Sequence, residues 1–144
     1  MSAWRHRAIE LFPDLREEFE DPEATIYNVF LELLPRVREA HARGDIEEMK
    51  RLYGYAEWCF QQKAKELWNA AGVAFYEHLV DDPITFDAIP EWLPRPVFVG
   101  VCSLFEARLK PADYRRLCDA YSKKHGPIDL PRPITADGPD DWAI

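Results

Sequence analysis

The stretch YGYAEWCFQQKAKELWNAAGVAFYEHL, residues Tyr53–Leu79, decides the fold. It holds two of the five tryptophans, three of the six tyrosines and a run of small residues at 70–74. Nothing within it is a strong helix breaker, yet one helix from Asp45 to Val80 would be roughly 54 Å long at 1.5 Å per residue. A domain of this size does not cover that length. We therefore predict two consecutive helices with a turn near Gln61–Lys65.

The two predicted helices differ in the residues with which they are expected to pack. The first, Asp45–Gln62, places its apolar side chains on one face, beginning with Ile46. The second, Glu66–Val80, contains Gly72 inside the small-residue run. Glycine within a helix costs about 1 kcal/mol relative to alanine. We therefore expect the run to be there because a neighbouring helix approaches closely.

Prolines, glycines and capping residues divide the rest of the chain into further helical segments. The further predicted helices are Ser2–Phe12, a short helix from Pro13, Pro22–Arg43 capped by Asp21, Val97–Leu109 and Pro111–Lys124. Pro35 is expected to kink or split the third of these near Leu31–Leu34. The segment Ile84–Leu93 is expected to be a loop with short turns.

These patterns predict an all-α protein with about six to seven helices, arranged as an antiparallel helical bundle or a short stack of helical hairpins. The apolar run Pro96–Cys102 is the one segment that could instead form a strand. Residues 1–126 are predicted to form a single helical domain. Residues 127–144 are rich in proline and are predicted to be an extended C-terminal arm or a disordered tail, with Trp142 able to dock back onto the domain.

Composition limits the classes of partner. The formal net charge of −8 argues against nucleic acid as a direct ligand, since phosphate binding needs a basic face.

No apolar run approaches the roughly 20 residues of a membrane span, and no signal peptide is visible, so we expect a cytoplasmic protein. The three cysteines, Cys59, Cys102 and Cys118, are expected to be buried free thiols, as in a reducing cytosol. We expect a monomer or weak dimer.

Motifs for catalysis or cofactor binding are missing from the sequence. It contains no GxSxG, no Walker motif and no GxGxxG. Cys59 and His78 could in principle form a Cys–His pair, but both lie on apolar faces. Glu77, His78, Asp81 and Asp82 have the i, i+4 spacing of half a metal site, with no second pair to complete it. We therefore expect no enzyme activity, no metal and no cofactor.

Charge is distributed unevenly along the chain. Residues 67–92 contain five acidic and no basic residues, whereas residues 93–126 contain seven basic and three acidic residues. An acidic loop that also carries aromatic residues suits protein recognition. Its predicted partner contacts are Asp81, Asp82, Phe86, Asp87, Glu91 and Trp92. Alternatively, the loop is simply solvated and its aromatic rings lie in the core.

Glu57 and Tyr76 are secondary candidates for partner contact. Glu57 lies between Tyr55 and Trp58 in the central stretch, and its helical phase places it off the most apolar face. It could line a binding surface, or it could bond a neighbouring helix end or an arginine.

Five segments carry a family resemblance. They are LFPDLREEFE (Leu11–Glu20), YAEWCF (Tyr55–Phe60), WNAAGVAFYEHL (Trp68–Leu79), WLPRPVF (Trp92–Phe98) and LFEARL (Leu104–Leu109). Together they resemble a family of small, acidic, all-helical bacterial domains of unknown function. That family is similar to the immunity proteins found beside polymorphic toxins (type VI/Rhs-type) of type VI and related secretion systems. The resemblance covers most of Leu11–Tyr121, and its segments are packing motifs without a catalytic signature.

The resemblance implies an immunity protein that binds a cognate secreted toxin domain and blocks its active site. The acidity of the chain would suit a toxin with a basic cleft, such as a nuclease or a nucleotide-using transferase. One alternative is a non-enzymatic helical adaptor or regulatory subunit of a bacterial complex. Another is a small metal-binding enzyme built on Glu77, His78 and Asp82.

Overall fold

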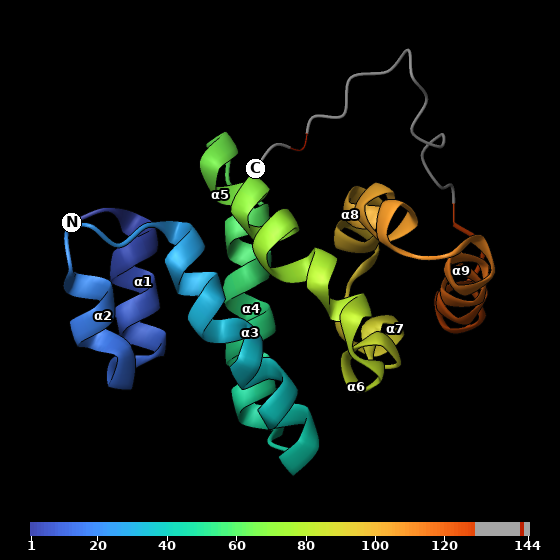
Figure 1. The fold of residues 1–144 in the computed structure, drawn as a ribbon, viewed down its shortest axis with the longest axis horizontal. Coiled ribbons are helices and arrows are strands. Elements are labelled where there is room, and N and C mark those ends of the chain that lie inside the picture. The colour runs from blue at the N-terminus through green and yellow to red at the C-terminus, as the bar shows by residue number, and fades with distance from the viewer. Residues whose placement is uncertain (129–141, 143–144) are drawn as a thin grey trace.

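A computed structural model describes residues 1–128 and Trp142 (Figure 1). No strand occurs among these residues, so the prediction of an all-α protein is confirmed and the alternative of a strand at Pro96–Cys102 is wrong. The α-helices are α1 (Ala3–Leu11), α2 (Arg16–Glu20), α3 (Ile26–Arg43), α4 (Ile46–Phe60), α5 (Lys65–Ala70), α6 (Pro83–Phe86), α7 (Ile89–Trp92), α8 (Arg95–Arg108) and α9 (Pro111–His125). Two 3-10 segments, η1 (Pro13–Leu15) and η3 (Tyr76–Asp81), and one π-helical segment, η2 (Ala71–Phe75), complete the order.

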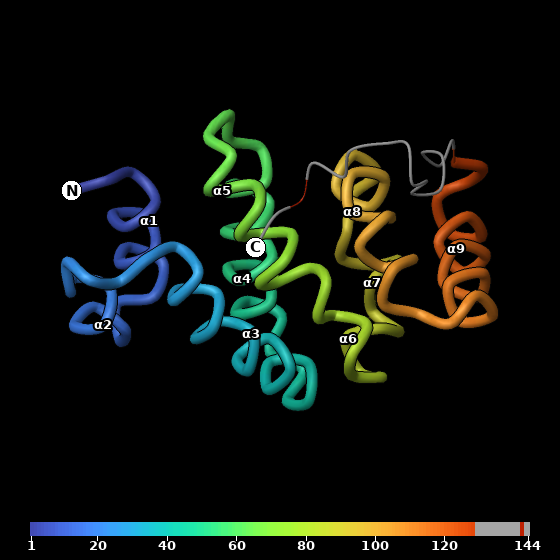
Figure 2. The backbone as a smooth tube through the Cα atoms, turned by 45° about the horizontal axis from the view of Figure 1, so that its top comes forward, coloured from blue at the N-terminus to red at the C-terminus, as the bar shows by residue number. Residues whose placement is uncertain are grey.

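The helices follow one another across the molecule in chain order. Figures 1 and 2 show α1 and α2 at one end, α3, α4 and α5 in the middle, and α8 and α9 at the other end. Helix α3 packs against α4 and against η2, and α9 packs against α7 and α8. A cluster of buried apolar residues extends through the row from Ala8 to Tyr121. The arrangement is therefore closer to a short stack of hairpins than to a closed bundle.

The predicted turn in the central stretch is present. Helix α4 ends at Phe60 and α5 begins at Lys65. The helix after the turn is not one regular α-helix, however, because it passes from α to π to 3-10 geometry between Lys65 and Asp81. The change from π to 3-10 geometry falls at Phe75, whose φ of −125° and ψ of −72° lie outside the α region. Such π segments occur often at functional sites.

The start of α3 differs from the prediction. The helix begins at Ile26 with Thr25 as its cap, and Asp21 lies outside it. The Asn28 amide donates to the Thr25 hydroxyl, and the Thr25 amide donates to the Asn28 side chain at 2.7 Å. Arg5 of α1 holds the preceding turn, because its guanidinium donates to the carbonyl oxygens of residues 19, 21 and 24.

Three other local predictions need correction. Pro35 lies inside α3 and does not split it, since the helix continues to Arg43; the alternative of a kink stays a prediction. Ile46 is 49% exposed because it is the first residue of α4 and lies beyond the buried face. The predicted loop Ile84–Leu93 contains α6 and α7, with Pro83 and Pro90 in their first turns, where a missing amide costs no hydrogen bond.

Trp142 docks back onto the helical body. Its ring stacks on Phe60, with centroids 6.2 Å apart, and meets the edge of Trp68 at 5.3 Å. Gly72 lies directly beneath it, since a Cβ there would fall 2.6 Å from an atom of the Trp142 ring. The close approach predicted for Gly72 is therefore present: the nearest neighbour of Gly72 itself is the Trp142 ring, while its segment η2 also packs against α3 and α4. The rest of the predicted arm, residues 129–141 and 143–144, lies outside the described residues.

The cysteine prediction is confirmed for two of the three thiols. Cys59 and Cys102 are buried, and burial raises the pKa of each to about 12. Cys118 is only half-buried, because α9 lies at the end of the row. No helix in the described part of the chain is both long and apolar enough to cross a membrane.

Candidate protein-binding site

Three carboxylates at the ends of α6 and in α7 form what we call the acidic edge: Asp82, Asp87 and Glu91. Asp82 precedes α6 and caps it by accepting a hydrogen bond from the Ile84 amide at 2.9 Å. Asp87 follows α6, Glu91 lies in the first turn of α7, and both are exposed. Within residues 1–128 and 142, no basic side chain forms an ion pair with any of the three. The edge therefore presents uncompensated negative charge.

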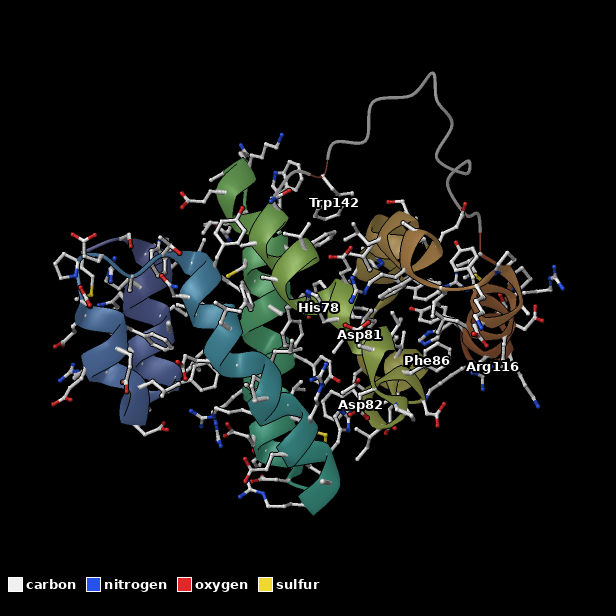
Figure 3. All side chains as sticks on the ribbon, viewed as in Figure 1. His78, Asp81, Asp82, Phe86, Arg116 and Trp142 are labelled. Carbon is white, nitrogen blue, oxygen red and sulfur yellow. The ribbon has the colours of Figure 1, made fainter. Side chains whose placement is uncertain are left out.

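Asp81 directly precedes the edge but is already paired. The Arg108 guanidinium donates two hydrogen bonds to its carboxylate, at 2.9 and 2.7 Å, and His78 Nδ1 lies 2.9 Å from the same group. Partial burial by itself raises the pKa of Asp81, but the hydrogen bonds from Arg108 and His78 outweigh burial and lower it. Figure 3 shows Asp81 close to His78, and the ion pair with Arg108 already neutralises its charge within the molecule. Partner contact by Asp81 stays a prediction, without the unpaired charge that it assumed.

The two aromatic residues predicted for this site differ in exposure. Phe86 is only 8% exposed, and the guanidinium of Arg116 lies 4.9 Å from its ring centroid. Phe86 is therefore a core residue and not the predicted contact. Trp92 is half-buried and stacks on Tyr53, with ring centroids 5.0 Å apart and planes 14° apart. Trp92 is thus held against the helical body by this stack and keeps part of its surface exposed.

A histidine lies next to this aromatic stack. The rings of His41 and Trp92 meet edge to face at 6.2 Å, and His41 Nε2 lies 2.7 Å from the Tyr53 hydroxyl. Burial lowers the pKa of His41, and the nearby charge of Glu91 opposes this in part. Sequence reasoning missed His41, because it is 50 positions from Glu91 along the chain.

The secondary candidates lie outside the acidic edge. Tyr76 is 1% exposed, with its ring packed on Phe60, so the prediction that it contacts a partner is wrong. Glu57 is half-buried on α4 and accepts a hydrogen bond from Gln61 at 3.2 Å. Its local bond is with its own helix and not with a neighbouring helix end or an arginine.

A cleft of about 400 Å³ lies beside the acidic edge. Its lining residues are Val80, Asp81, Pro83, Phe86, Asp87, Leu109, Asp113 and Arg116. Sequence reasoning missed Asp113 and Arg116, which belong to α9 and reach the cleft because α9 packs against α7, with Arg116 over the ring of Phe86. Arg116 and Asp113 are 3.6 Å apart, so this wall of the cleft carries little net charge.

The predicted half metal site does not gather further ligands. His78 faces Asp81 at 2.9 Å because η3 has 3-10 geometry, which brings residues three apart onto one face. Among the residues described, no three His, Cys, Asp or Glu side chains converge as a metal site would require.

The profile of a protein family described as "Domain of unknown function (DUF7674)" matches residues 5–98. The match covers more than half of the chain, which therefore belongs to this family. No curated protein and no solved structure matches the chain. The matched segment includes the acidic edge and Trp92 but ends before Arg108 and Arg116.

Proposed function

We propose that this chain is a non-enzymatic immunity protein that binds a cognate secreted toxin domain through the acidic edge. The observation that supports this most is the set of unpaired carboxylates, Asp82, Asp87 and Glu91, next to the rigid and partly exposed ring of Trp92. Uncompensated charge of one sign accelerates encounter with an oppositely charged partner. A fixed aromatic side chain at the same place supplies contact area with little loss of side-chain entropy on binding.

The charge of the edge favours one mode of inhibition. A toxin that acts on nucleic acid or nucleotides has a basic cleft for phosphate groups. Carboxylates that enter such a cleft would pair with the same Lys and Arg side chains and exclude the substrate. We therefore propose inhibition by occupation of the active site.

The test uses charge reversal at exposed positions that carry no structural bond. Asp87→Lys with Glu91→Lys reverses the edge, whereas Asp82 is left unchanged because it caps α6. Glu10→Lys with Glu18→Lys makes the same change of charge at exposed positions on α1 and α2. Tagged wild type and both variants are used to capture partners from cells of the protein's own host, followed by mass spectrometry.

The expected result is a partner that wild type and the α1–α2 variant retain and the edge variant loses. Its gene, expressed alone, should arrest growth, and co-expression of the wild-type chain should restore growth. A partner that the edge variant retains equally would remove the acidic edge from the proposal. A partner that is harmless when expressed alone would favour the adaptor alternative.

A further inference from the structure

We infer that an aromatic slot on α4, α5 and η2 binds a tryptophan side chain of a partner protein, and that Trp142 closes this slot in the free chain. The slot, which we call the indole slot, is formed by Phe60, Trp68 and Gly72. It shares no residue with the acidic edge, and Figure 3 shows Trp142 well away from Asp82. Binding at the indole slot is therefore independent of the proposed toxin.

The three residues of the slot contact the indole ring in different ways. Phe60 forms one face, since its ring stacks on that of Trp142 with planes 22° apart. Trp68 meets the Trp142 ring edge to face, at an interplanar angle of 82°. Gly72 forms the base, because a Cβ there would lie 2.6 and 2.7 Å from two atoms of the Trp142 ring. Stacked and edge-to-face contacts both depend on ring geometry, so the slot selects a flat aromatic side chain.

The helical body holds Phe60 in place. Phe60 meets the ring of buried Tyr76 edge to face, with centroids 6.0 Å apart. Gly100 of α8 makes room for Phe60, since a Cβ at Gly100 would lie 2.5 Å from an atom of the Phe60 ring. These contacts do not involve Trp142. We therefore expect the slot to keep its shape when Trp142 leaves, ready for a second ring.

The slot and its occupant lie in different parts of the chain. Phe60, Trp68 and Gly72 fall within residues 5–98, the segment that matches the family profile, whereas Trp142 lies beyond it. Even with Trp142 in place, Phe60 and Trp68 are only half-buried. Departure of Trp142 would expose two large aromatic rings side by side, and such a surface is typical of protein recognition.

Tethering decides which tryptophan can replace Trp142. Trp142 of the same chain competes for the slot at an effective concentration on the order of millimolar, because the chain joins it to the slot. Trp142 of a second copy would make the same contacts without that advantage. A partner protein can displace Trp142, because it adds contacts outside the slot to those of its own tryptophan.

The experiment is selection of a random peptide library, displayed on phage, against the full-length Trp142→Ala variant, in which the slot is open. We expect the enriched peptides to share a tryptophan. A labelled synthetic peptide from this set should bind the variant measurably by fluorescence anisotropy, and exchange of its tryptophan for alanine should abolish binding. Wild type should bind the same peptide at least about tenfold more weakly, because a site that is open about one-tenth of the time loses that factor in affinity.

Two glycine substitutions locate the bound peptide. In the Trp142→Ala background, Gly72→Ala places a Cβ where the indole ring lies and should raise the Kd at least about tenfold. Gly54→Ala makes the same change on α4, where a Cβ meets nothing within 4 Å, and should leave the Kd unchanged. Asp87→Lys with Glu91→Lys should also leave the Kd unchanged. Circular dichroism checks that each variant is folded.

Several outcomes would overturn the inference. They are a selection that enriches no tryptophan, equal binding by wild type and the Trp142→Ala variant, and binding that Gly72→Ala does not weaken in a folded variant. Analytical ultracentrifugation tests the second copy as occupant. A wild-type dimer that Trp142→Ala abolishes would show that another copy of the chain fills the slot, and would overturn the assignment to a partner protein.

Discussion

At the scale of single residues, Asp81 joins two parts of the chain that are 27 positions apart. Its carboxylate accepts both hydrogen bonds from Arg108 and also contacts His78. The pairing fixes the end of η3 against the end of α8. Asp81 therefore differs from its neighbour Asp82 in charge pairing. The Asp82 carboxylate caps α6 and has no basic partner in residues 1–128 and 142.

Asp81→Asn keeps the shape of the side chain and removes its charge. Because the pair is partly exposed, we expect the free energy of unfolding near neutral pH to fall by roughly 1 kcal/mol or less. The pKa of Asp81 is lowered in the folded state, so its contribution is present above the unfolded pKa of about 4 and is lost as pH falls through the lower folded value. The difference between variant and wild type should therefore shrink in acid.

Urea unfolding at about pH 7 and about pH 3 measures this difference, with Asp119→Asn as the control, an exposed aspartate on α9. The control should change stability by only a few tenths of a kcal/mol. A difference for Asp81→Asn that is equally large at both pH values would show that the ion pair is not its source.

At the scale of secondary-structure elements, the chain offers two caps for α3 and uses only the second. Asp21-Pro22 and Thr25 both have the residue types of a helix start. Arg5 holds the carbonyl oxygens of Phe19, Asp21 and Ala24, which keeps the intervening backbone in a turn. Helix α3 therefore begins after that turn, at Ile26.

Thr25→Ala removes the cap and should lower the free energy of unfolding by about 1 kcal/mol. Asp21→Ala is the matched variant. It should cost clearly less, because among the residues described the Asp21 side chain accepts only from the nearby Glu23 amide, and Arg5 bonds the Asp21 backbone. Thermal and urea unfolding of both variants would measure the two costs. If Asp21→Ala were the more damaging change, α3 would begin earlier in solution than Ile26.

At the scale of the whole molecule, Trp142 connects the C-terminal end of the chain to the middle of the row. It lies on Phe60, Trp68 and Gly72, which belong to α4, α5 and η2. Glycine at position 72 is a poorer helix former than alanine, but it leaves room for a ring that is 70 positions away in the sequence. Aromatic contacts of this kind stabilise a fold by about 1 kcal/mol per pair.

Gly72→Ala should have opposite effects in two backgrounds. In the full chain its Cβ would meet the Trp142 ring, so the ring must move and the near-ultraviolet circular dichroism of the Trp68–Trp142 pair should weaken. With Trp142→Ala already present, the same change should stabilise by up to about 1 kcal/mol, because alanine is the better helix former.

Gly54→Ala is the control, since a Cβ at Gly54 of α4 would meet nothing within 4 Å. It should stabilise both backgrounds equally. If Gly72→Ala had the same effect with and without Trp142, contact with that ring would not be the reason for glycine at this position.

The sequence alone determined the fold class, the turn near Gln61, the end of α3 at Arg43, just before Gly44, and the acidic character of residues 81–91. These features depend on local properties: helical spacing, the φ of +68° that glycine adopts at 44, and the residue types themselves. The tertiary structure decided which candidate side chains are available to a partner. Asp81 is paired with Arg108, Phe86 and Tyr76 are buried, and Asp87 and Glu91 remain exposed.

Tertiary structure likewise decided the start of α3 and the neighbour of Gly72. It also left Leu31 of α3 exposed, beside a hollow that Leu34 and Val73 help to line. In each case the deciding contact joins residues from different helices. Their spacing along the chain contains no information about that contact, because burial and charge pairing depend on how the helices pack against one another.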